Sequence, residues 1–378
     1  MKFHVPTKIH FGSGSISLLK GVIEEELKAS RLLLVTDQGL VESGLAEKVI
    51  SQLPEICVFD RVEPNPRNET VNNGGEWARR SRPDAVIGFG GGSSLDAAKA
   101  IALLATNSGK IEDYEGKGKY RYPPLPVVAI PTTCGTGSEV TWVSVVTHTE
   151  RRFKMSIKGP EMFPEVALLD PDLLLTLPPF LIASTGMDAL THAVEAYTVK
   201  AANVITDIFA VTAVELILDA MERVYRDIKG DSDAREKIML GSTLAGMAFG
   251  NSDVGAVHCL SEALGSLYDT PHGVANSLFL PHVMEYNLPA AEGRYADIAR
   301  LAGIKGEEDG SLARKLIPKI AALSQSMGIP SLRDLGVKES DFLEIAEKSY
   351  QNNSNPSNPR EMNVEDYLAI LQKMVSEA

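Results

Sequence analysis

Residues 84–99 read Asp84-Ala85-Val86-Ile87-Gly88-Phe89-Gly90-Gly91-Gly92-Ser93-Ser94-Leu95-Asp96-Ala97-Ala98-Lys99, an apolar run followed by glycines and a helix start. The apolar run is typical of a strand that is buried in a parallel sheet. Glycines let the backbone approach a ligand closely, and a helix N-terminus offers free N–H groups and a partial positive charge. The stretch therefore predicts an α/β fold with either a pyrophosphate site or a plain strand-to-helix turn at this point.

The same pattern recurs on both sides of this stretch. Arg31–Asp37 and Leu125–Ile130 read as further buried strands, and amphipathic stretches separate the three. This alternation indicates β-α-β units around a parallel sheet, in which ligands collect at the carboxyl ends of the strands. Beyond about Leu181 the sequence is helical, with 3.6-residue periods over Thr206–Ile228 and Asp233–Ala248. We predict a Rossmann-like α/β nucleotide-binding domain over residues 1–180 and an all-helical domain over residues 181–378.

Composition limits the partners of the protein. The chain has 378 residues, of which 44% are hydrophobic, and its net charge of −13 argues against a nucleic-acid or anionic-membrane partner. It shows neither a signal-peptide pattern nor the roughly 18 consecutive apolar residues of a membrane span. Cys57, Cys134 and Cys259 lie far apart and form no CxxC motif. These observations predict a soluble, reduced, cytoplasmic protein.

Two loops that follow predicted strands suit a nucleotide. Gly88–Ser93 has serine at the sixth position, where the GxGxxG fingerprint has glycine, and the candidate ribose-binding acid, Asp37, lies upstream. A site here would therefore be arranged differently from the usual dinucleotide fold. The stretch Pro131-Thr132-Thr133-Cys134-Gly135-Thr136-Gly137-Ser138-Glu139 offers hydroxyl groups that suit ribose and phosphate contacts. Turn chemistry could explain either loop alone, but the combination is more specific.

Four side chains of the helical half predict a metal site. Asp188 and His192 are four residues apart in a helical run, so both lie on one helix face about 6 Å apart. His258 lies in an apolar helical stretch, and His272 lies between Pro271 and Gly273 in a restricted turn. Taken singly, each feature has an ordinary explanation. Asp188 and His192 could be a surface pair, His258 a core histidine, and His272 part of a plain loop. Together, one carboxylate and three imidazoles would leave a divalent ion one net positive charge, which makes a Lewis-acid site.

Taken together, these motifs resemble the iron-containing (group III) alcohol dehydrogenase family. The resemblance runs from Lys8-Ile9-His10-Phe11-Gly12 to Asn358-Pro359-Arg360 and so covers essentially the whole chain. It rests on Thr36-Asp37, Pro64-Asn65-Pro66, Gly90-Gly91-Gly92-Ser93, Pro131-Thr132-Thr133, Gly186-x-Asp188-x-x-x-His192, His258 and Pro271-His272-Gly273. The resemblance implies a dehydroquinate-synthase-like architecture, with a nucleotide domain before a helical domain and the active site in the cleft between them.

The resemblance also implies roles for individual residues. The metal ligands would be Asp188, His192, His258 and His272. The cofactor would be held by Asn65, by Gly91, Gly92, Ser93 and Asp96 of the pyrophosphate loop, by Thr132, Thr133 and Thr136 beside the nicotinamide, and by Lys154 at the ribose. Iron(II) is the metal expected from the family, although zinc or another divalent ion suits the same ligands. Asp37 can accept from the adenosine 2′-hydroxyl and repels a 2′-phosphate, which predicts NAD rather than NADP.

The implied activity is reversible hydride transfer between NAD(H) and a short-chain alcohol or aldehyde, of the primary alcohol or diol type, in a homodimer or larger homo-oligomer. Phe249 and Asp253 are candidates to border the substrate. In one respect the chain departs from the family: Glu262 stands where many members carry a second histidine, four residues after His258. Glu262 is either a solvated or neutral substitution, or a group that relays the alcohol proton or adds a ligand to the metal.

Two other functions compete with this interpretation. The first is a dehydroquinate-synthase-like lyase, which also uses NAD and a metal but acts on a sugar-derived phosphate. Such a substrate needs clustered lysines and arginines, whereas the residues around the predicted ligands, including Ala189, Leu190, Ala193, Val254 and Val257, are mostly apolar. The second is a non-catalytic nucleotide-binding protein, which would give no reason for four metal ligands.

Overall fold

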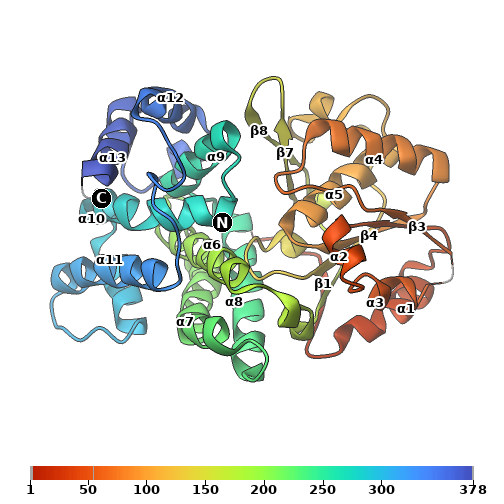
Figure 1. Cartoon of the computed structure of the whole chain (residues 1–378), viewed down its shortest axis with the longest axis horizontal. Helices are drawn as coiled ribbons and strands as arrows, with labels where there is room; N and C mark the ends of the chain where they lie inside the picture. Colours follow the sequence, from red (N-terminus) through yellow and green to blue (C-terminus); the bar gives the residue numbers. More distant parts are fainter. Residues whose placement is uncertain (1–2, 54, 377–378) are drawn as a thin grey trace. The chain divides into compact units, whose positions relative to one another are not determined.

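A computed structural model describes residues 3–53 and 55–376, and it divides the chain into two compact units (Figure 1). The first unit runs from His4 to Thr176, and the second runs from Leu177 to the C-terminus. Phe3 belongs to the second unit, and its ring stacks on that of Phe209 with the centroids 5.0 Å apart. The division falls four residues before the boundary placed at 180 from the sequence.

The first unit is built on a six-stranded parallel sheet with the strand order β1-β9-β6-β4-β2-β3. The predicted strands correspond to β2 (Leu32–Val35), β4 (Ala85–Gly90) and β6 (Val127–Pro131), which are neighbours in the sheet. The other strands are β1 (Lys8–Phe11), β3 (Ile56–Phe59) and β9 (Val166–Leu169). All of these pairings are parallel, so the loops that follow β2, β4 and β6 leave the same edge of the sheet.

Helices cover both faces of this sheet because successive strand residues point to opposite sides. Leu33 and Val35 belong to the core cluster that includes residues of α4 (Asn68–Ser81) and α5 (Gly92–Thr106). Leu32 and Leu34 belong to the opposite cluster. That cluster contains residues of the helical segments on the other face: the 3₁₀ turn Ser15–Leu18, α1 (Leu19–Gly21), the π-helical turn Val22–Leu27 and α3 (Glu47–Ile50).

A second, smaller sheet was not predicted from the sequence. It has the order β5-β8-β7, in which β7 (Val143–His148) pairs antiparallel with β8 (Phe153–Lys158), and β5 (Gly116–Lys117) pairs parallel with β8. Because β7 begins soon after the threonine-rich loop, this hairpin continues directly from one of the two candidate nucleotide loops.

The second unit is helical throughout its described part (Figure 1). The predicted helices correspond to α7 (Val204–Asp227) and α8 (Ser232–Ser252). The others are α6 (Pro179–Thr198), α9 (Ala256–Tyr268), α10 (His272–Leu301), α11 (Asp309–Ser326), α12 (Phe342–Gln351) and α13 (Val364–Ser376). Helix α6 contacts α7, α8 and α10, and it is buried over almost its whole length. The predicted class, a parallel α/β region followed by an all-helical region, is confirmed.

Among the described residues, no helix is long and apolar enough to cross a membrane. The three cysteines differ in exposure: Cys57 on β3 is exposed, whereas Cys134 and Cys259 are buried.

Candidate active site

The second unit brings the four predicted metal ligands together. Helix α6 supplies Asp188 and His192, α9 supplies His258 from its first turn, and His272 is the first residue of α10. One ligand atom from each side chain lies within 4.8 Å of those of the other three. Asp188, His192 and His258 are buried, with at most 5% of their surface exposed, whereas His272 is half-buried.

The approach of α10 to α6 depends on a glycine. A Cβ at Gly273 would lie 2.2 Å from the backbone oxygen of Ser184 and 3.2 Å from the Cβ of Asp188. Only a residue without a side chain allows α10 to begin this close to α6, and the contact brings His272 to 3.8 Å from Asp188 Oδ1. Gly273, the glycine of the Pro271-His272-Gly273 motif, therefore sets the spacing of the cluster.

Aromatic contacts order the imidazole rings. The ring of His192 stacks on Phe249 with a centroid distance of 4.3 Å, and it lies 4.5 Å from the ring of His258. Phe249 thus lies at the cluster, next to one of its histidines. Among the described residues, this donor set is one carboxylate and three imidazoles, three of them buried and one half-buried, in one helical unit. Such a set fits a divalent transition metal with an open position for an oxygen ligand.

Two side chains that contact this cluster were missed from the sequence. Oε2 of Glu195 lies 2.5 Å from Nδ1 of His258. Asn276 Nδ2 donates to Oδ1 of Asp188 at 2.6 Å and lies 3.1 Å and 3.2 Å from the Nε2 atoms of His258 and His272. A signal was available in both cases, because Glu195 is seven residues after Asp188, and Asn276 is four residues after His272, on the same helix faces.

Glu195 also changes the electrostatics of the cluster. Burial lowers the pKa of His258, but the hydrogen bond and the charge of Glu195 outweigh it, so that this pKa lies above its usual value. Glu195 is therefore a second buried carboxylate beside the four potential ligands. It is not one of the four, but it contacts the imidazole of His258.

Glu262 shares the helix of His258 but is outside the group of four potential ligands. Its Oε2 accepts from Nδ2 of Asn352 at 2.6 Å. Asn352 belongs to the loop between α12 and α13, and the same loop holds Asp253 at the end of α8. The carboxylate of Asp253 accepts from the hydroxyls of Ser354 and Ser357. The loop of residues 352–357 is thus partly buried and contacts both Glu262 and Asp253.

The nucleotide candidates lie in the first unit, at the carboxyl edge of its large sheet. Gly91 caps α5 immediately after β4, and Ser93 follows in the first turn of that helix. Thr132 and Thr133 follow β6, the neighbouring strand, and the N–H of Thr132 donates to the oxygen of Gly90 at 2.9 Å. The two loops that were predicted to form a nucleotide site are therefore adjacent in the fold.

Glycines allow these two loops to touch. A Cβ at Gly92 would lie 2.4 Å from Cγ2 and 2.7 Å from Oγ1 of Thr136, and a Cβ at Gly91 would lie 3.3 Å from Cγ2 of Thr133. Free N–H groups at the start of α5 and the hydroxyls of the threonine loop are thus next to one another. This combination is suited to an anionic group.

Asp96 connects α5 to neighbouring parts of the first unit. Its carboxylate accepts from the hydroxyl of Ser138 at 2.5 Å and from the N–H of Val145 at 2.9 Å, and it lies 3.2 Å from Nζ of Lys99. Lys99 is fully buried and donates to the backbone oxygens of Ser138, at 3.0 Å, and Val143. These contacts fasten α5 to the threonine loop and to β7, so a direct contact between Asp96 and a cofactor stays a prediction.

The remaining cofactor candidates are distributed around the same unit. Asp37 follows β2 and caps α2 (Gln38–Glu42) by accepting from the N–H of Leu40 at 3.0 Å. Burial raises the pKa of Asp37, although the N–H groups of Leu40 and Gly39 partly oppose the shift. Lys154, on β8, donates to Oδ1 of Asn65 at 2.9 Å, so these two predicted cofactor residues are a contacting pair.

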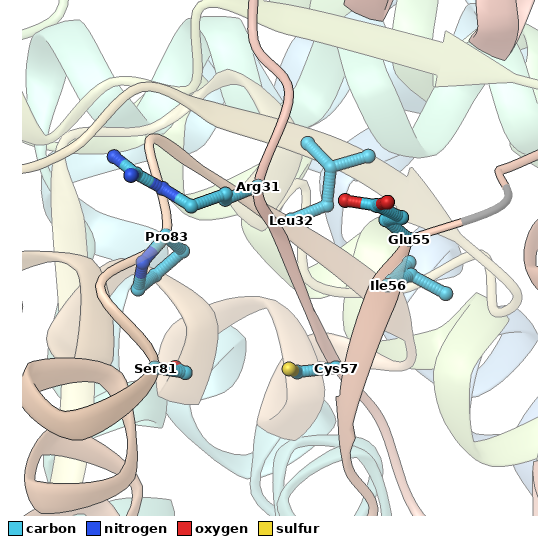
Figure 2. A pocket seen from close by; sticks show the side chains of 7 residues that line it. All are labelled: Arg31, Leu32, Glu55, Ile56, Cys57, Ser81 and Pro83. Atoms are coloured by element: carbon cyan, nitrogen blue, oxygen red, sulfur yellow. The ribbon is translucent and has the colours of Figure 1, made fainter.

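A pocket of about 280 Å³ lies at the opposite end of the strands. Figure 2 shows the seven side chains around it: Arg31, Leu32, Glu55, Ile56, Cys57, Ser81 and Pro83. Leu32 and Ile56 are the first residues of β2 and β3, so the pocket is at the amino edge of the sheet. Ligands of such folds bind at the carboxyl edge, and none of the candidate cofactor residues lines this pocket.

Comparison with known proteins agrees with this arrangement. A model of the iron-containing alcohol dehydrogenase family matches residues 6–171, and a model of the C-terminal part of the Fe-containing alcohol dehydrogenase family matches residues 182–375. A 1,3-propanediol dehydrogenase of Klebsiella pneumoniae is 42% identical, with 98% of this chain and 97% of the relative covered. An NAD-dependent methanol dehydrogenase of Bacillus methanolicus is 37% identical, with 98% of each covered.

The solved structures give the same result. The crystal structure of a 1,3-propanediol oxidoreductase matches with a TM-score of 0.94 and 42% identity, over 99% of both chains. The two family models together span almost the whole sequence, and the relatives match it end to end. The chain therefore belongs to the iron-containing alcohol dehydrogenase family.

Proposed function

We propose that this oxidoreductase interconverts short-chain alcohols, of the primary alcohol or diol type, and their aldehydes, using NAD(H) and a divalent metal ion. The group of Asp188, His192, His258 and His272, of which the first three are buried and His272 is half-buried, is the observation that carries the proposal. The names of two relatives, a 1,3-propanediol dehydrogenase and an NAD-dependent methanol dehydrogenase, support the substrate class and the cofactor.

The four side chains would hold the ion, and the protein would supply orientation and exclusion of water. When bound, a divalent ion supplies Lewis-acid polarisation of an alcohol or carbonyl oxygen. When bound, NAD(H) supplies the hydride chemistry. Phe249 stacks on His192 and keeps that ring in place, and Asp188 and His258, which would hold the ion with it, are buried. The low exposure of these groups strengthens electrostatic interactions inside the site.

We assign dinucleotide binding and metal binding to different parts of the chain. Residues 1–180 would bind the dinucleotide through the start of α5, with Gly91, Gly92 and Ser93, and through Thr132, Thr133 and Thr136. Asn65 and Lys154 would contact the ribose side, and Asp37 would select NAD by repelling a 2′-phosphate. Residues 181–378 would bind the metal and carry the catalytic site.

Iron(II) is the proposed metal because the chain belongs to the iron-containing family. A set of three imidazoles and one carboxylate also accepts zinc, so the native ion has to be measured. The lyase alternative is not favoured, because both family models and the curated relatives are alcohol dehydrogenases. The same findings set aside a non-catalytic nucleotide-binding protein.

We further propose a cytoplasmic homodimer or larger homo-oligomer. The strand β1 is an edge of the six-stranded sheet, and Phe11 at its end is 40% exposed. An exposed edge with unpaired backbone groups is a ready site for pairing with a second copy. Light scattering with the purified chain would test the assembly.

The first experiment is anaerobic reconstitution with iron(II), followed by NADH oxidation with a panel of short aldehydes, hydroxyaldehydes and 2-oxo acids. We expect metal-dependent turnover with aldehydes, and the ranking of the panel would give the substrate class. A chelated sample provides the blank. Absence of turnover with the whole panel, despite binding of both metal and NADH, would contradict the proposed reaction.

The role of Glu262 is tested separately. If Glu262 relays the alcohol proton, the Glu262→Gln variant will lose turnover and change its pH profile while still binding metal. Unchanged turnover and an unchanged profile would leave Glu262 with only its contact to Asn352.

A further inference from the structure

Glu195 is a carboxylate in the interior of α6, which is buried over almost its whole length. It lies on α6, three residues after His192 and seven after Asp188, and only 4% of its surface is exposed. Burying a carboxylate is costly unless its oxygens are well paired. Both oxygens contact the first turn of α9: Oε1 accepts from the N–H of Val257 at 2.8 Å, and Oε2 lies 2.5 Å from Nδ1 of His258.

These contacts determine which ring nitrogen of His258 carries the hydrogen. An ionised carboxylate has no hydrogen to donate, so Nδ1 of His258 must be the donor in its contact with Glu195. In a neutral imidazole the other nitrogen, Nε2, then has a free lone pair. The amide of Asn276 gives independent support: its Nδ2 can only donate, and it lies 3.1 Å from Nε2 of His258. Contacts on both sides of the ring therefore agree on one tautomer.

We propose that Glu195 is a positioning residue that fixes His258 in the Nδ1–H tautomer, so that its Nε2 lone pair faces the other three side chains of the cluster. This inference rests on the proposed function in one respect, namely that the cluster binds a divalent ion. Carboxylates that accept from the distal nitrogen of a ligating histidine fix the ring and make it a stronger ligand. The negative charge of Glu195 also offsets the single net positive charge that one carboxylate would leave on a divalent ion.

The geometry makes glutamine a poor replacement at this position. Glu195 accepts from two donors, the N–H groups of Val257 and His258, whereas a glutamine side chain has only one oxygen. If that oxygen accepts from Val257, the amide nitrogen faces Nδ1 of His258 and favours the other tautomer, which points an N–H into the cluster. If the glutamine oxygen instead accepts from His258, the N–H of Val257 faces the glutamine amide nitrogen, which is also a donor. Aspartate keeps two acceptor oxygens, although it is shorter by one methylene.

The test compares the affinities of the wild type and three variants for cobalt(II) and zinc(II) by competition with a chelator. We expect about 10- to 100-fold weaker binding for Glu195→Gln, the range seen for such partners of metal-ligating histidines. Glu195→Asp should bind more tightly than Glu195→Gln. Asp207→Asn is the matched control: it also removes a partly buried carboxylate from the helical unit, but one that pairs with Arg294 at 2.9 Å. Its metal affinity should stay within about twofold of the wild type.

Equal affinities for the wild type and Glu195→Gln would overturn the inference. A second measurement needs no variant: ¹⁵N spectra of the histidine rings in the metal-free wild type should show His258 protonated on Nδ1, and protonation on Nε2 alone would overturn the inference. Failure of the wild type to bind any divalent ion would instead contradict the proposed function. The two failures are therefore distinguishable.

Discussion

Asp37 shows how one side chain can serve both the fold and the choice of ligand. Its carboxylate caps α2 by accepting from the N–H of Leu40, and it follows β2 at the carboxyl edge of the sheet. An asparagine at this position keeps the oxygen that caps the helix but removes the charge, so it separates the two functions. A glycine at this position removes both the capping oxygen and the charge.

We expect Asp37→Asn to lose preference for NAD over NADP, because the repulsion of a 2′-phosphate disappears while α2 stays capped. The ratio of kcat/KM for the two cofactors measures the effect. Asp37→Gly should relax the ratio in the same direction at a small additional cost in stability, a few tenths of a kcal/mol. Wild-type ratios in both variants would show that another residue discriminates.

The discrimination against NADP should also depend on pH. Burial raises the pKa of Asp37, so its charge is lost on acidification at a higher pH than for an ordinary aspartate. Because the carboxylate repels the 2′-phosphate only when ionised, the preference for NAD should fall as the pH is lowered. The same sign applies to stability: an acid with a raised pKa favours the folded state when protonated, and this contribution is lost as the pH rises through its pKa.

The measurement is the ratio of kcat/KM for NAD and NADP from roughly pH 4, near the usual pKa of aspartate, up to roughly pH 8, with Asp37→Asn as the control. The 2′-phosphate itself titrates near about pH 6, so the control removes its contribution. Parallel curves for the wild type and the control would contradict the assignment to Asp37.

At the scale of secondary structure, the junction of α10 with α6 determines whether the cluster can form. Gly273 has almost no free space around its Cα, whereas a Cβ at Gly293, in the part of α10 that follows the kink at Ala291, would meet nothing within 4 Å. Alanine is the better helix former by about 1 kcal/mol, so the two glycines should respond in opposite ways to the same substitution.

We expect Gly273→Ala to destabilise the protein by roughly 1–3 kcal/mol, the usual cost of overpacking, and to weaken metal binding. Gly293→Ala should leave metal binding unchanged and the unfolding temperature equal or higher. Thermal unfolding and chelator competition of the two variants check both statements. A Gly273→Ala variant with wild-type stability and metal affinity would show that α10 can shift without cost.

Sequence patterns predicted the elements better than the contacts between them. The apolar runs of β2, β4 and β6 and the periodicity of α7 and α8 are local signals, and the structure confirms them. The small sheet of β5, β7 and β8 was missed because β5 is only two residues long and β8 alternates apolar and polar residues, unlike the continuous apolar runs of the buried parallel strands.

The candidate site shows the same division. Asp188 and His192 were predicted to face one cavity because helical spacing is a local rule. The partners of Glu195 and Lys99 could not be predicted, since their contacts join residues 63 and 39–44 positions apart. Such pairs follow from how helices pack, and that packing is set by contacts such as the one at Gly273. A single sequence does not display them.

For the whole molecule, the distribution of ligands between the two units predicts how each unit is stabilised. All four potential metal ligands are in the unit that begins at Leu177, and the nucleotide candidates are in the unit His4–Thr176. A ligand stabilises the structure that binds it, by about 2.7 kcal/mol at a free concentration of 100 times Kd.

We therefore expect removal of the metal by a chelator to increase hydrogen exchange in α6, α9 and α10, with little change in the large parallel sheet. Addition of NAD should instead protect the start of α5 and the threonine loop. Hydrogen exchange followed by mass spectrometry of peptides resolves these regions. Uniform loosening of both units on chelation would contradict the assignment of the ion to the helical unit.

The unequal exposure of the three cysteines has a practical use. Cys57 is exposed at the amino edge of the sheet, whereas Cys134 is buried and burial raises the pKa of the buried Cys259 thiol well above its usual value. Thiolates rather than thiols react with maleimides, so a dye should attach selectively to Cys57. The native chain could thus carry one fluorophore at a site away from the candidate cofactor loops. The emission of this fluorophore could then be used to measure ligand binding without an engineered mutation.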